Sequence, residues 1–127
     1  MKELPKIIQE IGFDFGWSEE KVWELNVPTE EMPIDMLAWH FGIPFWSTEC
    51  GYYDLKPQEV IDNPQEHKKE YERTMRADLK YPIDVMENKG RLLILDGLHR
   101  LTKAKIIGID TVQVRNIPRK YIKDIKV

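Results

Sequence analysis

The sequence contains a single cysteine, Cys50, and only three histidines among its 127 residues. One cysteine cannot form an intramolecular disulfide, and Cys50 and the histidines are not spaced as zinc ligands. No apolar run approaches the length of a membrane-spanning helix, and charges interrupt the first residues where a secretory signal would be apolar. We therefore expect a soluble, unprocessed protein of a reducing cytoplasm.

The net charge is small, but the charged residues are strongly segregated. The net charge is −3, yet residues 1–50 hold ten acidic and three basic side chains, whereas residues 89–127 hold ten basic and three acidic ones. The basic third can attract the phosphates of a nucleotide, a nucleic acid or a small metabolite, and the acidic third argues against nonspecific wrapping of duplex DNA. Charge alone leaves a solvated mixed-charge surface equally open.

The first half of the chain predicts short helices. Residues 4–12 carry apolar side chains at helical spacing, and Ser18 has the position of an N-cap before a helix in which Trp23 faces inward. Residues 29–41 predict another short helix, to which Met36 contributes apolar surface. All four tryptophans lie in this half. We interpret them as core residues, with a base-stacking platform as the alternative.

The second half predicts strands and helices around one small sheet. The predicted elements are an amphipathic helix at residues 65–79, a hairpin of strands 81–86 and 92–95, a helix at 98–107 and a strand at 111–115. The expected fold class is α+β, with a small mixed sheet and packed helices in a single domain of residues 1–127. We divide it into a helical part (1–50), a core (51–118) and a basic tail (119–127).

The turn Asp96-Gly97 lies where the predicted strand changes directly into a helix. The N–H groups of a first helical turn lack intrahelical partners and carry the positive end of the helix dipole. Gly97 has no β-carbon, so an oxyanion can approach these N–H groups closely. The turn is therefore a predicted anion site.

Basic side chains follow this turn. Arg100 can present a fork of donors to phosphate oxygens, His99 can donate to another oxygen, and Lys103 adds a charge one turn later. Asp96 would repel phosphate unless it binds Mg²⁺, accepts from a substrate hydroxyl or pairs with Arg100, which makes it the candidate metal ligand or catalytic residue. The alternative, and the favoured one from these residues alone, is helix capping plus a surface salt bridge.

Residues 92–114, centred on Asp-Gly-Leu-His-Arg, resemble the strand-turn-helix-strand signature of the ParB/sulfiredoxin-like superfamily. Residues 55–59 and 77–83 resemble its earlier elements, so the likeness covers residues 55–118. In those proteins the turn and the helix start bind the phosphates of ATP, ADP or CTP. The resemblance implies that Gly97, Leu98, His99, Arg100 and Lys103 form the nucleotide site here.

Two branches of the superfamily fit poorly. Sulfiredoxin has its catalytic cysteine where this sequence has Leu98, so sulfinic acid reduction is not expected. ParB partition proteins have a glycine, a glutamate and two arginines in this region, followed by a helix-turn-helix domain, so centromere binding by that route is not expected either. The free-serine kinases share the Asp-Gly-X-His-Arg form and use an upstream glutamate as base. Glu59 best resembles that glutamate, although a solvated place in a first helical turn is equally open to it.

We therefore expect a nucleotide-binding protein, and an ATP-dependent phosphotransferase or NTPase as its activity. Asp96 and Glu59 are the expected catalytic residues, and Asp96 the expected Mg²⁺ ligand. One alternative is a non-catalytic regulatory or partner-binding module that keeps the phosphate turn. Another is a nucleic-acid-binding or ParB-like nuclease domain, suggested by the basic residues 119–123.

Overall fold

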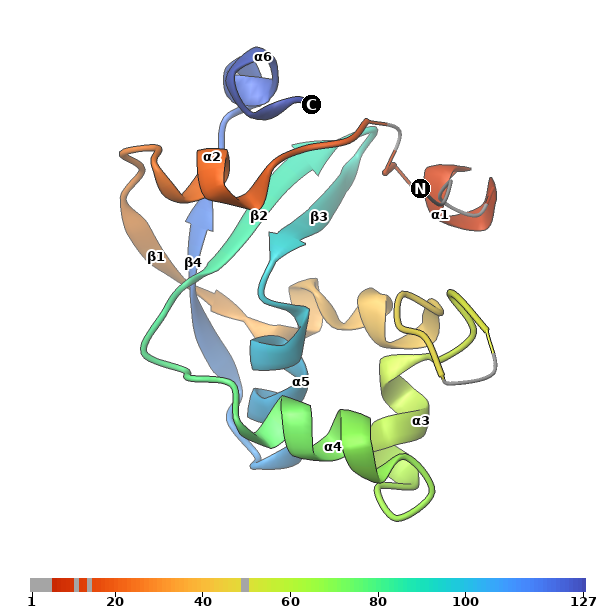
Figure 1. Ribbon diagram of the computed structural model, residues 1–127. Coiled ribbons are helices and arrows are strands. Elements are labelled where there is room, and N and C mark those ends of the chain that lie inside the picture. Colours follow the sequence, from red (N-terminus) through yellow and green to blue (C-terminus); the bar gives the residue numbers. More distant parts are fainter. Residues whose placement is uncertain (1–5, 11, 14, 49–50) are drawn as a thin grey trace.

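The computed structural model describes residues 6–10, 12–13, 15–48 and 51–127, so Cys50 lies outside the described residues. The chain forms a mixed α+β fold around a four-stranded sheet (Figure 1). Its elements are α1 (Lys6–Glu10), α2 (Glu19–Trp23), β1 (Thr29–Pro33), the 3-10 helices η1 (Ile34–Met36) and η2 (Ala38–Gly42), α3 (Pro57–Asp62), α4 (Lys68–Met75), β2 (Ile83–Asn88), β3 (Arg91–Asp96), α5 (Leu98–Ile106), β4 (Thr111–Asn116), η3 (Arg119–Tyr121) and α6 (Ile122–Ile125). None of the helices within these ranges is both long and apolar enough for a membrane crossing.

The sheet has the strand order β1-β4-β2-β3. β2 and β3 form an antiparallel hairpin, and β4 pairs with β2 in parallel and with β1 antiparallel. Lys89 and Gly90 form the two-residue turn of the β2–β3 hairpin, and both have positive φ angles, of 52° and 79°. Such turns match the right-handed twist of the strands, so the predicted hairpin is confirmed.

Helices cover both faces of the sheet. In Figure 1, α3, α4 and α5 gather on one side, away from α2 and α6. One core cluster joins β-strand residues to α5 and the 3-10 helices, and its fully buried members include Leu37, Ile83, Val85, Leu101 and Val114. The opposite cluster joins the sheet to α2 and α6 through Val22, Met86, Leu95, Ile117 and Ile125. The alternation of side chains along β2 therefore supplies both cores.

The predicted elements of the second half are confirmed, with shorter helices and with strands that are shifted or longer. α4 lies within the helix predicted at residues 65–79, and α5 ends one residue before its predicted limit. Gly108, with φ +83°, stops α5, and the N–H of Ile109 donates to the carbonyl of Ala104 at 2.9 Å. This is the left-handed C-terminal cap that a glycine at this position predicts.

The helix predicted at residues 29–41 is wrong. The segment begins as strand β1, whose one buried side chain is Met32, and continues as two short 3-10 helices. β1 satisfies the free backbone edge of β4, so sheet pairing overrides the local helical pattern. Met36, expected to provide apolar surface, is 51% exposed.

The C-terminal segment packs against the protein rather than forming a tail. Residues 119–127 contain η3 and α6, and Ile125 is fully buried beside Val22 of α2. The N–H of Ser18 donates to the carbonyl of Ile125 at 2.8 Å. The expected division at residue 50 is also not a structural boundary, because β1 belongs to the central sheet.

His40 is a buried polar residue of the core, and we expect it to make the protein acid-sensitive. Its Nδ1–H donates to the carbonyl of Leu37 at 2.8 Å and its Nε2 accepts from the N–H of Ile94 at 3.0 Å, so the ring is neutral. Burial lowers the pKa of His40 from 6.5 to about 4. Between these pH values the unfolded chain binds more protons than the folded one, so this contribution to stability is lost as pH falls from 6.5 towards 4.

His40→Gln removes this titration and retains a donor and an acceptor. The urea midpoint of the variant should fall less between pH 6.5 and 4 than that of the wild-type protein. Parallel pH profiles of the two proteins would contradict the assignment.

Candidate functional site

The end of β3 and the start of α5 meet at Gly97, which has φ +112°. A β-carbon at this position would lie 3.1 Å from both Nη1 of Arg100 and Cγ1 of Ile83. The N–H of Leu101 donates to the carbonyl of Gly97 at 3.0 Å, so the helix begins immediately after the glycine. The N–H groups of the first turn of α5 are therefore available at this end of the helix.

A basic pocket of about 390 Å³ opens at this helix start. It is lined by Arg73, Arg76, Ala77, Asp78, Tyr81, Asp96, Gly97, His99 and Arg100. Arg73 and Arg76 come from the end of α4, both are exposed, and no ion pair of theirs is recorded among the described residues. Three arginines thus face two aspartates, which gives the pocket a positive balance.

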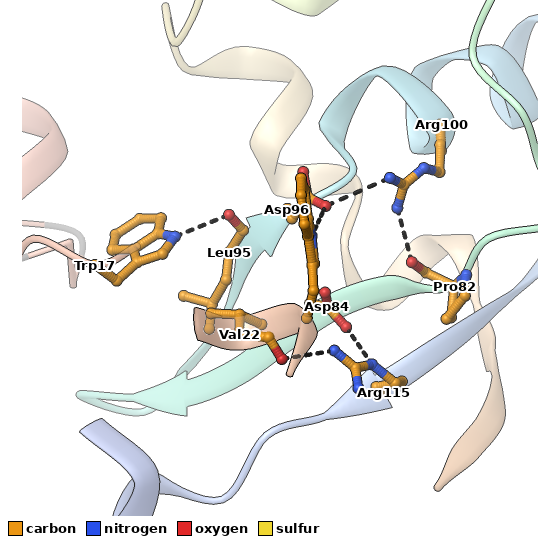
Figure 2. A network of polar contacts seen from close by, with 9 residues as sticks. Trp17, Val22, Pro82, Asp84, Leu95, Asp96, Arg100 and Arg115 are labelled. Atoms are coloured by element: carbon orange, nitrogen blue, oxygen red, sulfur yellow. Dashed lines mark hydrogen bonds and ion pairs between the residues drawn. The ribbon is translucent and has the colours of Figure 1, made fainter. Parts of the chain in front are cut away.

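Arg100 is held firmly between the strands and the turn. Its Nη1 donates to the carbonyl of Pro82 at 2.7 Å, and its Nη2 lies 3.4 Å from Oδ2 of Asp96 (Figure 2). The expected pairing of Asp96 with Arg100 is therefore present. A guanidinium has five N–H donors, so Arg100 retains donors for a ligand while its position is set by the protein.

A second pocket, the aromatic pocket, has a volume of about 560 Å³ and adjoins the first. Its lining residues are Trp23, Tyr81, Pro82, Asp84, Asp96, Arg100 and Arg115. Tyr81, Asp96 and Arg100 belong to both pockets, so the two pockets are neighbours. Trp23 and Tyr81 are 56% and 54% exposed, unusual for such large apolar rings. The prediction that the tryptophans are core residues is thus wrong for Trp23.

Asp84 and Arg115 come from the central strands β2 and β4. The sheet register places Asp84 opposite both Asp96 of β3 and Arg115 of β4. Nε of Arg115 donates to Oδ1 of Asp84 at 2.6 Å, and Nη2 donates to the carbonyl of Val22 (Figure 2). Nη1 donates to the carbonyl of Leu25. Burial raises the pKa of Asp84, and the Arg115 ion pair opposes this rise.

Asp96 also receives contacts from α2, the helix that covers this face. Nε1–H of Trp23 donates to Oδ2 of Asp96 at 2.8 Å. Glu19, in the first turn of α2, is hydrogen-bonded to Asp96. Desolvation of its carboxyl group, followed by the hydrogen bond and charge of Asp96, raises the pKa of Glu19 to about 7. The Glu19 carboxyl can therefore exchange a proton near neutral pH, a property of acid–base groups in active sites.

His99 and Lys103, both expected to hold phosphate, are largely engaged by the protein. Nε2 of His99 lies 2.6 Å from the carboxylate of Glu70, and its ring stacks on Trp46 at 4.4 Å between centroids. Burial lowers the pKa of His99, so the neutral ring donates to Glu70 and anchors α5 to α4. Nζ of Lys103 donates to the carbonyl of Ala77 at 2.8 Å and supports the same helix pair.

The side chains of Leu98 and Glu59 do not lie in the site where we expected them. The side chain of Leu98 packs with the apolar cluster of Trp46 and Val60, so only its backbone N–H faces the helix start. Glu59 lies exposed in the first turn of α3, where its carboxylate accepts from the N–H of Lys56 at 2.8 Å. It lines neither the basic pocket nor the neighbouring pocket around Trp23 and Tyr81. Its position corresponds to the first-turn alternative.

The contacts of Asp96 do not fit those of a magnesium ligand. Mg²⁺ is usually bound by one or two carboxylates together with water and substrate phosphate. Oδ2 of Asp96 already accepts from Trp23 and Arg100, and Asp96 is also bonded to Glu19. In the described part of the chain, no three His, Cys, Asp or Glu side chains are grouped to hold a metal. We derive no chemical step through a metal at this position.

Several residues of the site were missed in the sequence. Arg73 and Arg76 are three positions apart within the predicted helix 65–79. The sequence therefore could have predicted a basic patch near the end of this helix. Charged residues inside apolar strands, at Asp84 and Arg115, were a signal for a buried ion pair. No local pattern indicated that Glu19 reaches Asp96, because these residues are far apart in the chain.

Known proteins provide no further assignment of this site. No family model, no curated protein and no solved structure matches the chain. The interpretation of the site therefore depends on its geometry and its charges.

Proposed function

We propose that the protein binds a nucleotide and holds a phosphate group in the basic pocket at the start of α5. The observation that carries this proposal is the arrangement of three arginines and a helix N-terminus around one pocket. Arg73 and Arg76 lack partners among the described residues, and Arg100 is fixed beside Gly97. Phosphate is the anion that arginine forks and first-turn N–H groups bind together most readily.

Two further features support a nucleotide as the source of the phosphate. The adjoining aromatic pocket offers space and apolar walls beyond the phosphate position. Residues 92–114 also resemble the phosphate-binding unit of the ParB/sulfiredoxin-like superfamily, and the strand, turn and helix occur in the order that this resemblance implies. We include membership of that superfamily in the proposal.

Phosphoryl transfer is the reaction class that we propose for this site. Asp96 pairs with Arg100, and the neighbouring Glu19 carboxyl can accept a proton near neutral pH. In such a step, the oxygen of an acceptor hydroxyl bonds to the terminal phosphorus while the bond from that phosphorus to the bridging oxygen breaks. The hydroxyl proton passes to Glu19, and Arg100 stabilises charge on the transferred group. This role replaces the one expected for Glu59.

The double variant Arg73→Gln/Arg76→Gln tests the phosphate position. We expect its affinity for ATP, ADP, CTP or GTP, whichever binds, to fall at least ~10-fold in calorimetric titration at low salt, because charge-assisted hydrogen bonds contribute about 1.5–3 kcal/mol each. Its thermal stability should be unchanged, since both side chains are exposed. Arg119→Gln removes an equally exposed charge from η3, which lines neither pocket, and serves as the matched control.

The outcomes separate the possible functions. If no nucleotide binds to the folded wild-type protein, the nucleotide proposal is wrong. If binding is unaffected by the double variant, the phosphate lies elsewhere. Release or transfer of phosphate from ATP or CTP, lost in Glu19→Gln with binding retained, supports the enzyme; binding without turnover supports the regulatory alternative.

A further inference from the structure

We propose that the aromatic pocket holds the base of the nucleotide, stacked on Trp23 and Tyr81, with an N–H donor of the base directed at Asp84. This inference rests on the proposed function, because it assumes that the phosphate occupies the basic pocket. It adds the placement of the base and the phosphate of the nucleotide in the two pockets, and a preference among the bases. Four observations carry it.

The charges of the two pockets assign the two ends of the ligand. Beyond the residues that it shares with the aromatic pocket, the basic pocket has two more arginines, Arg73 and Arg76, and one more acidic residue, Asp78. The aromatic pocket instead adds Arg115 and Asp84, which neutralise each other in an ion pair at 2.6 Å. An anionic group therefore prefers the basic pocket, and an uncharged ring prefers the aromatic one.

The aromatic walls are exposed but held in place. Nε1–H of Trp23 is bonded to Asp96, and the guanidinium carbon of Arg100 lies 5.9 Å from the centroid of the Tyr81 ring. Pro82 adds a third apolar surface to the same pocket. Bases stack on such rings in many nucleic-acid-binding sites, and rings fixed beforehand lose little entropy on binding.

Asp84 supplies a directed acceptor in the aromatic pocket. Its side chain is 3% exposed and lines the pocket, and Arg115 uses Oδ1. Its second oxygen, Oδ2, has no hydrogen-bond partner among the described residues. Every fully enclosed polar side-chain atom in these residues has a partner, so Oδ2 is not fully enclosed. Oδ2 is therefore reachable from the pocket. A buried acceptor of this kind discriminates strongly between ligands that do and do not donate to it.

The residues shared by the two pockets give the sugar its place. Tyr81, Asp96 and Arg100 line both pockets, so a ligand that fills both must pass over these residues. The amino groups of adenine, cytosine and guanine can donate to Asp84. The single N–H of uracil is flanked by two carbonyl oxygens, which a carboxylate repels. We therefore expect uridine nucleotides to bind most weakly.

The test compares ligands that share a phosphate and differ in the base. Ribose 5-phosphate, AMP, CMP, GMP and UMP are titrated calorimetrically into the wild-type protein and its variants. At least one amino-bearing nucleotide should bind ~10-fold or more tighter than ribose 5-phosphate, as expected for one stacked base. UMP should bind more weakly than that nucleotide.

Variants of the two exposed rings locate the base. Trp23→Leu and Tyr81→Leu should each reduce the difference in affinity between the nucleotide and ribose 5-phosphate. Trp23→Phe keeps a ring but lacks the bond to Asp96, so it should retain most of the difference. Tyr52→Leu changes an exposed aromatic residue that lines neither pocket, and is the matched control.

Each result has a distinct meaning. If ribose 5-phosphate binds as tightly as every nucleotide, the base site is wrong while the phosphate proposal stands. If neither binds, the proposed function fails and this inference fails with it. A difference that survives in both leucine variants places the base elsewhere and overturns the inference. Equal affinity for UMP overturns the role given to Asp84.

Discussion

Replacing Arg115 by methionine is expected to lower the free energy of unfolding by about 3–5 kcal/mol, the usual cost of removing one partner of a buried ion pair. Arg115 is bonded to Asp84 and to two carbonyl groups of the α2 region, so its loss leaves a buried carboxylate and two carbonyls without donors. Methionine retains much of the side-chain volume, which limits any cavity. Urea denaturation at pH 7 measures the effect.

The pH dependence of this variant identifies the cause. In the wild-type protein the pKa of Asp84 is already raised by burial, and the loss of Arg115 raises it further. The deficit of Arg115→Met should therefore shrink as pH falls and Asp84 takes up a proton. Asp84→Asn in the same chain should recover part of the lost stability at pH 7.

A control separates the ion pair from a general change of charge. Arg119→Met removes an exposed arginine from η3 and should change stability by less than about 0.5 kcal/mol. A deficit of Arg115→Met that is equally small, or that grows at low pH, would show that the pair does not stabilise this face of the sheet.

Gly97→Ala should have the second large effect, and it should affect both stability and binding. An alanine at φ +112° is strained, at a cost of about 1–3 kcal/mol. Its β-carbon would also lie 3.1 Å from Nη1 of Arg100 and from Ile83, so the arginine must shift. We expect a loss of about 2–3 kcal/mol in unfolding free energy and a weaker affinity for phosphate compounds.

Gly90→Ala is the matched control for this substitution. Gly90 also has a positive φ, of 79°, but nothing lies within 4 Å of an added β-carbon. It should therefore show backbone strain without the contact at Arg100, and phosphate binding should be unchanged. If both variants lose the same stability and neither loses affinity, Gly97 does not shape the phosphate site.

The strand-glycine-helix turn could be predicted because all its determinants are local. An apolar strand, a glycine and a helical pattern follow each other directly in residues 92–106, and the geometry of that junction depends on neighbouring residues. The β2–β3 hairpin and the C-terminal cap of α5 at Gly108 were predictable for the same reason.

Side-chain roles around the turn were less predictable. His99 and Lys103 have the right chemistry for phosphate, but only the packing of α4 on α5 brings Glu70 and the Ala77 carbonyl to them. The same packing places the unpaired Arg73 and Arg76 at the helix start. Which basic residue is free and which is engaged depends on partners 26 to 29 positions away.

The sequence by itself determined the local units: the hairpin, the helix caps and the strand-glycine-helix turn, whose conformations depend on short-range sterics and hydrogen bonding. Only the tertiary structure decided the rest of the site. Strand register brings Asp84, Asp96 and Arg115 into adjacent strands, and the docking of α2 brings Glu19 and Trp23 to Asp96. These contacts join residues that are distant in the sequence. Burial of the two sheet faces selects which strands pair and where α2 docks, and no local pattern encodes that selection.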